Sequence, residues 1–303
     1  MTVFSEERLA PVNGIEIAYQ EMGDRKGDPL LLIMGLGTQM LGWDEGFCAL
    51  LAERGFRVIR FDNRDIGHST MLDWAGIPRR LDLFRGPRSK APYLLTDMAE
   101  DAFGLMDHLG IEAAHVVGVS MGGMIAQTMA IHRPERLRSL ASMLSTTGNR
   151  RLGWPTWRAF SLLMASYPRS REAYERRAVK TFAVIGSPRY PSERERVAQV
   201  AGEMYERSHN PRGILRQMHA ITASGDRTPA LRRLGVPTVV IHGDSDPLVR
   251  PAAARATARA VPGARLRMIE GMGHDLPREL WPTFVEEIAA VVARAEGQAR
   301  QAA

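Results

Sequence analysis

The segment Gly118–Gly122, with the sequence Gly-Val-Ser-Met-Gly, limits the possible folds more than any other part of the chain. The apolar run Val116–Val117 precedes it, and a helix-patterned segment from Met124 to Ile131 follows. Gly-x-Ser-x-Gly between a strand and a helix is typical of a sharp, strained turn that lifts the serine side chain clear of a sheet. The two glycines are expected because strand and helix approach too closely there for a Cβ atom. An ordinary glycine-rich turn, such as a phosphate-binding loop, is the alternative.

Strand-like and helix-like segments alternate along most of the chain. This alternation predicts a parallel sheet that is covered by helices on both faces. The expected strands are Ile15–Gln20, Leu30–Met34, Arg57–Phe61, His115–Val119, Leu140–Leu144, Val236–Ile241 and Arg265–Ile269. The expected helices are Phe47–Leu51, Ala99–Leu109, Met124–Ile131, Ala252–Ala260 and Leu280–Ala295.

The alternation stops between Asn149 and about Arg227, where only helical segments are indicated, with breaks at Pro168, at 188–191 and at Pro211. We therefore expect residues 149–227 to form a helical cap inserted over the sheet. Residues 1–148 and 228–303 would then form one α/β core, for which 303 residues and a hydrophobic content of 45% are ample.

Composition narrows the setting in which the chain works. No apolar run approaches the ~18 residues of a membrane span, and the first residues lack the charged and apolar regions of a secretory signal. Cys48 is the only cysteine, which excludes an internal disulfide and favours a reducing compartment. We therefore expect a cytoplasmic protein, present as a monomer or a small homo-oligomer.

The net charge of +6 comes from an arginine-rich stretch. Between Arg150 and Arg216 there are 14 basic and 6 acidic residues, an excess of +8. A nucleic-acid surface would need this charge on one face with interleaved aromatics or a known binding module, and no such module is present. We interpret the arginines as a solvated face, with attraction of an acidic substrate as the alternative.

Two later loops offer partners for Ser120. A serine hydroxyl is a weak nucleophile until a base takes its proton, and the base needs an acid to orient it. The loop 242–249, His-Gly-Asp-Ser-Asp-Pro-Leu-Val, and the loop 271–277, Gly-Met-Gly-His-Asp-Leu-Pro, follow the last two expected strands. Both would lie beyond the carboxyl ends of a parallel sheet, where such sites assemble.

Together with the segments Ile33–Gly37 and Ile59–Ser69, these motifs make the sequence resemble the α/β-hydrolase family over nearly its whole length. Within that family it resembles the subgroup that contains the aclacinomycin methylesterases. The resemblance implies a mostly parallel, doubly wound sheet with a helical cap. It also implies His274 as the base and, just before the proline of a Gly-x-x-Asp-Pro loop, Asp246 as the acid. Asp244, two residues upstream, is the competitor and is interpreted as a loop residue.

Two backbone N–H groups are expected to stabilise an oxyanion. One belongs to Met121, directly after the serine, and the resemblance implies Leu36 for the other. Many members of the family carry His-Gly before this position, whereas this chain has Met34-Gly35. The departure removes a side-chain hydrogen bond that would brace the loop, but it leaves the backbone donor in place.

The implied activity is serine-dependent hydrolysis of a carboxylic ester with a bulky apolar part. The use of serine speaks against haloalkane dehalogenases and epoxide hydrolases, which resemble this family but use aspartate. A lactonase, amidase or perhydrolase with the same residues is an alternative, as is a non-catalytic ligand receptor on the same fold. We expect a small-molecule ester as partner and no cofactor, metal or nucleic acid. The residues expected to line the substrate pocket are Met34, Met40, Trp43, Met124, Trp154, Trp157, Phe160 and Met164.

Overall fold

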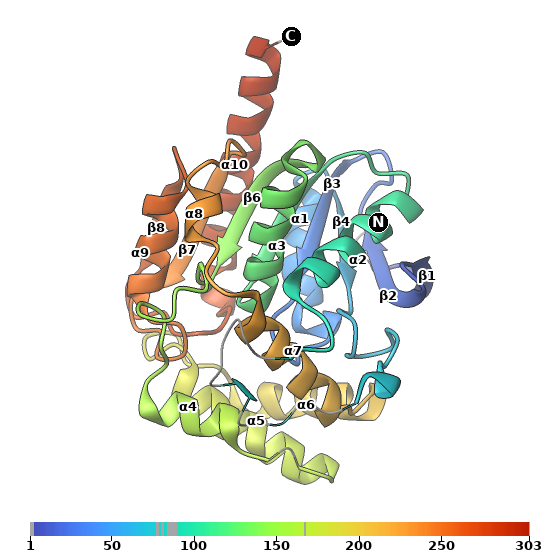
Figure 1. Ribbon diagram of the computed structural model, residues 1–303, viewed down its shortest axis with the longest axis vertical. Helices are drawn as coiled ribbons and strands as arrows, with labels where there is room; N and C mark the ends of the chain where they lie inside the picture. The colour runs from blue at the N-terminus through green and yellow to red at the C-terminus, as the bar shows by residue number, and fades with distance from the viewer. Residues whose placement is uncertain (1–2, 77–78, 80–81, 84–89, 167, 303) are drawn as a thin grey trace.

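The computed structural model, which describes residues 3–76, 79, 82–83, 90–166 and 168–302, contains one eight-stranded sheet (Figure 1). The strand order is β1-β2-β4-β3-β5-β6-β7-β8. The pairs β1/β2 and β2/β4 are antiparallel, and all other neighbours are parallel. The strands are β1 (Arg8–Val12), β2 (Ile15–Met22), β3 (Asp28–Ile33), β4 (Phe56–Phe61), β5 (Ala114–Val119), β6 (Leu137–Met143), β7 (Thr238–Gly243) and β8 (Arg265–Ile269).

Helices cover both faces of the sheet (Figure 1). One core cluster unites the sheet with α1 and α10, and a second cluster on the other face unites it with α2, α3 and the end of α9. The core helices are α1 (Glu45–Glu53), α2 (Leu95–His108), α3 (Met121–His132), α8 (Thr228–Leu231), α9 (Pro251–Ala260) and α10 (Trp281–Ala302). The prediction of a mostly parallel sheet between two layers of helices is confirmed.

One strand, β1, is not predicted by the sequence pattern. Its sequence, Arg-Leu-Ala-Pro-Val, contains Pro11, and a proline cannot donate to a sheet ladder. The structure accommodates it because β1 is the edge strand and pairs only with β2. The turn between them is formed by Asn13 and Gly14, both with positive φ, as a tight hairpin requires.

The described part of residues 149–227 contains helices and no strand. These helices are α4 (Trp157–Met164), α5 (Arg171–Ile185), α6 (Arg194–Arg207) and α7 (Pro211–Ser224). They form a group at one end of the sheet, and α7 lies between the sheet and the others (Figure 1). They therefore lie at the carboxyl ends of β3, β5 and β7, where the loops that carry candidate residues begin.

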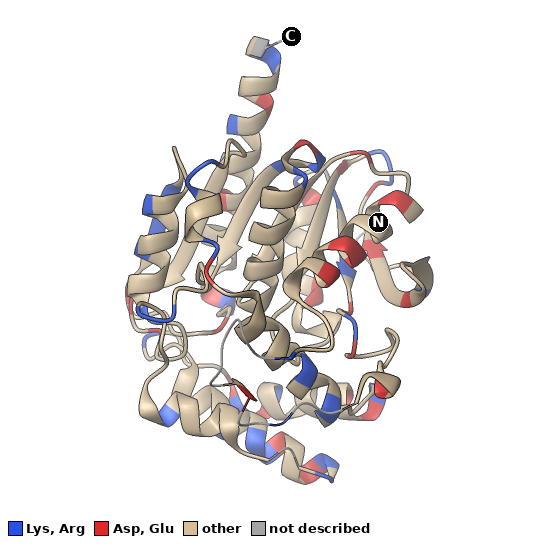
Figure 2. Ribbon diagram, viewed as in Figure 1, with Lys and Arg blue, Asp and Glu red and all other residues tan. Residues whose placement is uncertain are grey.

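Charges on this helical group are mixed rather than of one sign. Figure 2 shows Asp and Glu positions interspersed with Lys and Arg positions along the ribbons of α5 and α6. Arg171 pairs with Glu175 at 2.8 Å, and Arg207 pairs with Glu7 at 2.9 Å. Within the described residues, no helix combines the length and apolar character needed to span a membrane.

The buried His115 on β5 leads to a prediction about stability in acid. Burial, with a further contribution from the charge of Arg138, lowers the pKa of His115 to about 4, against about 6.5 in an unfolded chain. Between these two values the unfolded chain binds the proton and the folded chain does not. The free energy of unfolding therefore falls as the pH falls through this window, by about 3 kcal/mol from this residue.

Urea unfolding of the wild type and of His115→Gln between pH 7.5 and pH 4.5 would measure this contribution. We expect a shallower loss of stability in the variant, because glutamine takes up no proton. His242 and His219 also have lowered pKa values through burial and remain in both proteins, so the difference between the two curves isolates His115. Parallel curves would contradict the assignment.

Candidate active site

Ser120 occupies a strained turn between β5 and α3. Its backbone has φ 55° and ψ −118°, in the positive-φ region that a residue with a Cβ rarely adopts. A Cβ atom on Gly118 would lie 2.2 Å from the Gly122 carbonyl oxygen, and one on Gly122 would lie 2.0 Å from the Ile33 carbonyl oxygen. Both glycines are therefore required by close backbone approach. The turn is held by hydrogen bonds from Ser120 N to the Met143 carbonyl and from Ser145 Oγ to the Ser120 carbonyl.

Two hydrogen bonds link Ser120 to His274 and His274 to Asp246. The Ser120 Oγ lies 3.1 Å from His274 Nε2, and His274 Nδ1 lies 2.6 Å from Asp246 Oδ2. The carboxylate can only accept, so Nδ1 carries the proton and Nε2 is free to accept the serine hydroxyl proton. The three residues come from the loops after β5, β7 and β8, at one edge of the sheet. This arrangement is suited to general-base activation of a serine.

Asp246 and Asp244 have different partners, although they are two residues apart. Asp246 is buried; its Oδ1 accepts hydrogen bonds from the backbone N–H groups of Leu248 and Val249, which leaves Oδ2 for His274. Asp244 Oδ1 instead accepts from Ser245 Oγ and from the backbone N–H of Gly271. The structure brings Asp246, and not Asp244, to His274.

His242 is a member of this site that sequence reasoning missed. Its Nε2 lies 2.7 Å from the Val249 carbonyl oxygen and 3.3 Å from Asp246 Oδ2. Since the carbonyl oxygen must receive a hydrogen, Nε2 is the protonated nitrogen. Burial lowers the pKa of His242, which favours the neutral ring. His242 stands four residues before Asp246, at the end of a strand, and that spacing is the signal that could have found it.

The loop that carries His274 is hydrogen-bonded to the end of α5 and to the segment that follows it. The His274 N–H donates to the Ile185 carbonyl at 2.7 Å, and the Gly273 N–H donates to Ser187 Oγ at 2.8 Å. Ser187 Oγ donates to the buried carboxyl of Asp275, whose pKa is raised by burial. No sequence motif marks these contacts, because the partners are 86 or more residues apart.

The expected oxyanion donors lie beside the serine. A Cβ atom on Gly35 would lie 3.1 Å from Ser120 Cβ, so the loop after β3 directly contacts the turn that carries Ser120. Met121 is the first residue of α3, and the first N–H groups of a helix have no partner within it. Within the described residues, neither the Leu36 N–H nor the Met121 N–H donates a hydrogen bond.

The eight residues expected to line the pocket fall into two groups. Met34, Met40, Trp43 and Met124 are all buried, in the segments that follow β3 and β5, and Trp154, Trp157, Phe160 and Met164 lie in or next to α4. Trp154 stacks on Phe160 with ring centroids 6.0 Å apart.

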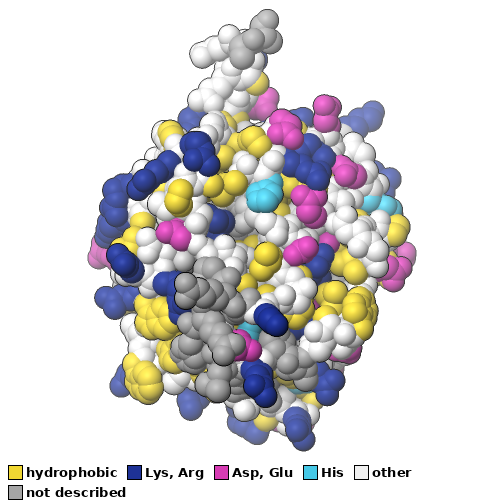
Figure 3. All heavy atoms as spheres, in the orientation of Figure 1, with side chains coloured by type: hydrophobic (Ala, Val, Ile, Leu, Met, Phe, Trp, Pro, Cys, Tyr) yellow, Lys and Arg dark blue, Asp and Glu magenta, His cyan; other side chains and the backbone are white. Residues whose placement is uncertain are grey.

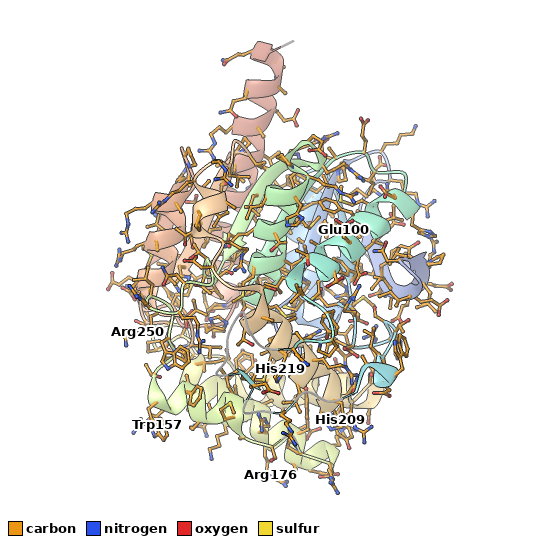
Figure 4. The ribbon with its side chains drawn as sticks, in the orientation of Figure 1. Glu100, Trp157, Arg176, His209, His219 and Arg250 are labelled. Carbon is orange, nitrogen blue, oxygen red and sulfur yellow. The ribbon has the colours of Figure 1, made fainter. Side chains whose placement is uncertain are left out.

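Two of these residues lie in contrasting surroundings. Trp43 is completely buried and stacks on Phe47 in the core cluster that includes α1 and α10. Trp157, on α4, is 80% exposed (Figure 4). Figure 3 shows apolar side chains gathered in this part of the surface. The pocket role of all eight residues stays a prediction.

Other polar residues near the site have structural partners. Arg64 makes two hydrogen bonds, of 2.5 and 2.6 Å, to the Asp101 carboxylate on α2. His68 lies 2.6 Å from Glu7 Oε1 and 2.9 Å from the Arg207 carbonyl oxygen. Among the described residues, no group of three or more His, Cys, Asp or Glu side chains is arranged to hold a metal ion.

The sheet order, the serine turn after β5 and the loops after β7 and β8 together define a class of protein with the α/β hydrolase fold. A comparison with family models agrees: residues 28–277 match the model described as alpha/beta hydrolase fold. The chain belongs to this family.

Comparison with individual proteins gives a more specific likeness than the family model. The chain is 31% identical to the rhodomycin D methylesterase DnrP of Streptomyces peucetius, over 93% of this chain and 97% of that protein. It is 29% identical, with the same coverage, to the rhodomycin D methylesterase DauP of Streptomyces sp. (strain C5). Among solved structures, the enol-lactonase of Burkholderia xenovorans LB400 superposes with a TM-score of 0.75 at 24% identity, covering 94% of this chain and all of that one. The last likeness concerns the fold alone.

Proposed function

We propose that the protein hydrolyses a carboxylic ester with Ser120 as nucleophile, His274 as general base and Asp246 as the acid that orients the base. The observation that carries this proposal is the pair of hydrogen bonds, of 3.1 and 2.6 Å, that joins the three side chains. The likeness to two methylesterases in a family of hydrolases identifies the chain as a carboxylic ester hydrolase in the broader sense.

The proposed reaction has two steps. Ser120 Oγ attacks the ester carbonyl carbon while its proton passes to His274 Nε2, and the Leu36 and Met121 N–H groups stabilise the oxyanion. The carbon–oxygen bond to the alcohol then breaks, and His274 gives the proton to the leaving oxygen. A water molecule attacks the acyl-serine, His274 takes one of its protons and returns it to Ser120, and the carboxylic acid is released.

We further propose that residues 149–227 act as a cap over this site and that the substrate is a bulky apolar ester. The position of α4–α7 at the carboxyl edge of the sheet supports the first point. The aromatic and methionine side chains of α4 support the second. The two methylesterase relatives are named for rhodomycin D, which favours rhodomycin D as a test substrate.

The proposal is tested with p-nitrophenyl esters of increasing acyl length, aromatic methyl esters and a set of lactones. We expect turnover of esters, with the preferred acyl length reporting the size of the pocket. Turnover of lactones alone would favour the lactonase alternative. Stoichiometric binding of these compounds without turnover of any would contradict the proposal and favour a receptor.

A further inference from the structure

The buried side chain of Gln217, on α7, joins two core loops that lie far apart in the sequence. Its Oε1 accepts a hydrogen bond of 2.9 Å from the Gly37 N–H, and its Nε2 donates one of 2.9 Å to the Arg64 carbonyl oxygen. The side chain is completely buried. Because an N–H only donates and a carbonyl oxygen only accepts, these partners leave one possible orientation of the amide.

Gly37 directly follows Leu36, whose N–H is an expected oxyanion donor. The loop is close to the nucleophile at Gly35, where an added Cβ would lie 3.7 Å from Ser120 Oγ. Gly37 has φ +67°, and an added Cβ there would lie 3.2 Å from the Ile214 side chain of α7. Helix α7 therefore contacts the loop both by packing and by the hydrogen bond that Gln217 Oε1 accepts from the Gly37 N–H.

Helix α7 is itself firmly attached to the turn after β4. Arg216, the residue before Gln217, makes hydrogen bonds of 2.8 and 2.7 Å to the Asp65 carboxylate, and both side chains are completely buried. Asn210 Nδ2 donates to the Asp65 carbonyl at 3.1 Å. Figure 4 labels His219 on the same helix, at the end of the sheet. Gln217 thus reaches Gly37 from a fixed position.

We infer that Gln217 is a positioning residue for the oxyanion hole, an inference that rests on the proposed function. It holds the Leu36–Gly37 peptide, which directly follows the Gly35–Leu36 peptide that carries the Leu36 N–H, and so limits the direction of that N–H beside Ser120. Met34 stands where many family members carry a histidine, and methionine cannot brace the loop through a strong hydrogen bond. In this chain, residues outside the loop after β3 hold it in place. Gln217 accepts from the Gly37 N–H, and Asn63 Nδ2 donates to the Met34 carbonyl at 3.0 Å. The cap helix, and not only the core, then completes the site.

The first test is kinetic and uses three variants. Gln217→Met has nearly the same length and shape but can neither accept from Gly37 nor donate to Arg64. We expect kcat to fall roughly 10- to 100-fold with KM within about twofold, since the donor acts on the transition state rather than on the bound ester. Gln217→Glu keeps an acceptor for the Gly37 N–H and should recover part of the loss. Gln199→Met, on the exposed face of α6 where Gln199 Nε2 donates to Glu203 at 2.8 Å, is the matched control and should match the wild type.

Two further readouts separate positioning from simple stability. Gln217→Met should weaken the binding of an alkylboronic acid, which forms a tetrahedral adduct with a serine nucleophile, by the same factor as kcat. It should also speed hydrogen exchange at the Gly37 amide, a measurement that does not depend on activity. Gln199→Met should change neither.

The outcomes distinguish this inference from the proposed function. An active wild type with kcat and boronate affinity unchanged in Gln217→Met would overturn the inference and leave the proposed function standing. A rise in KM alone would also overturn it, because Gln217 would then only shape the pocket. A wild type that neither turns over esters nor binds the boronate at Ser120 would overturn both.

Discussion

Replacing Ser120 with alanine is expected to lower kcat/KM for any ester that the wild type hydrolyses by about 10⁴- to 10⁶-fold. Removal of a serine nucleophile costs this much because its hydroxyl forms the covalent bond, and only substrate binding and oxyanion stabilisation remain. The loss should be of chemistry rather than of folding, since alanine accepts the same strained backbone and no side-chain hydrogen bond of Ser120 holds the turn. Initial rates and a thermal melt of the purified variant measure the two quantities.

Ser5→Ala is the matched control, because Ser5 lies beside the edge of β2, where its Oγ accepts from the Glu21 N–H. It should keep full activity. Residual hydrolysis above about 1% of the wild-type rate in Ser120→Ala, with the same melting temperature, would show that another group carries the reaction.

Replacing Asp246 with asparagine is expected to lower kcat by about 10³- to 10⁴-fold, whereas Asp244→Asn should stay within about fivefold of the wild type. The Asp246 carboxylate accepts a hydrogen bond of 2.6 Å from His274 Nδ1. The NH2 group of an asparagine would donate to Nδ1 instead, and the imidazole would then be held in the wrong tautomer. Asp244 touches Ser245 and Gly271 instead, and its loss affects only that loop.

The two aspartates are close in the sequence and change charge equally, so each variant controls for the other. Steady-state kinetics on one p-nitrophenyl ester suffices. A greater loss in Asp244→Asn than in Asp246→Asn would reverse the assignment of the acid.

The sheet and the serine turn could be predicted because local patterns indicate them. Short segments rich in apolar residues, of which Leu30–Met34 is the clearest, indicate the parallel strands, and the glycines around Ser120 indicate a turn that a strand meeting a helix requires. The order of the strands places the loops 242–249 and 271–277 at one edge of the sheet, and the family resemblance implied Asp246 and His274 within them. The edge strand β1 could not be predicted, because Pro11 interrupts its pattern.

The hydrogen bonds that attach α7 to the core loops could not be predicted, because they join residues that no local sequence pattern connects. Gln217 lies 180 residues from Gly37, in a helix whose sequence resembles that of any amphipathic helix. The polar residues Arg216 and Gln217 are completely buried there, whereas amino-acid type alone favours exposure for both. In the same way, residue type does not distinguish the completely buried Trp43 from Trp157, which is 80% exposed. The bounds of the cap, the eight lining residues and the cytoplasmic location stay predictions.

The nucleophilic role of Ser120 is the central claim, and covalent labelling with a fluorophosphonate followed by peptide mapping tests it most directly. We predict one label per chain, on the peptide that contains Ser120, formed far more slowly in the His274→Ala variant and absent from Ser120→Ala. A label on another serine, or undiminished labelling of the Ser120→Ala protein, would contradict the account.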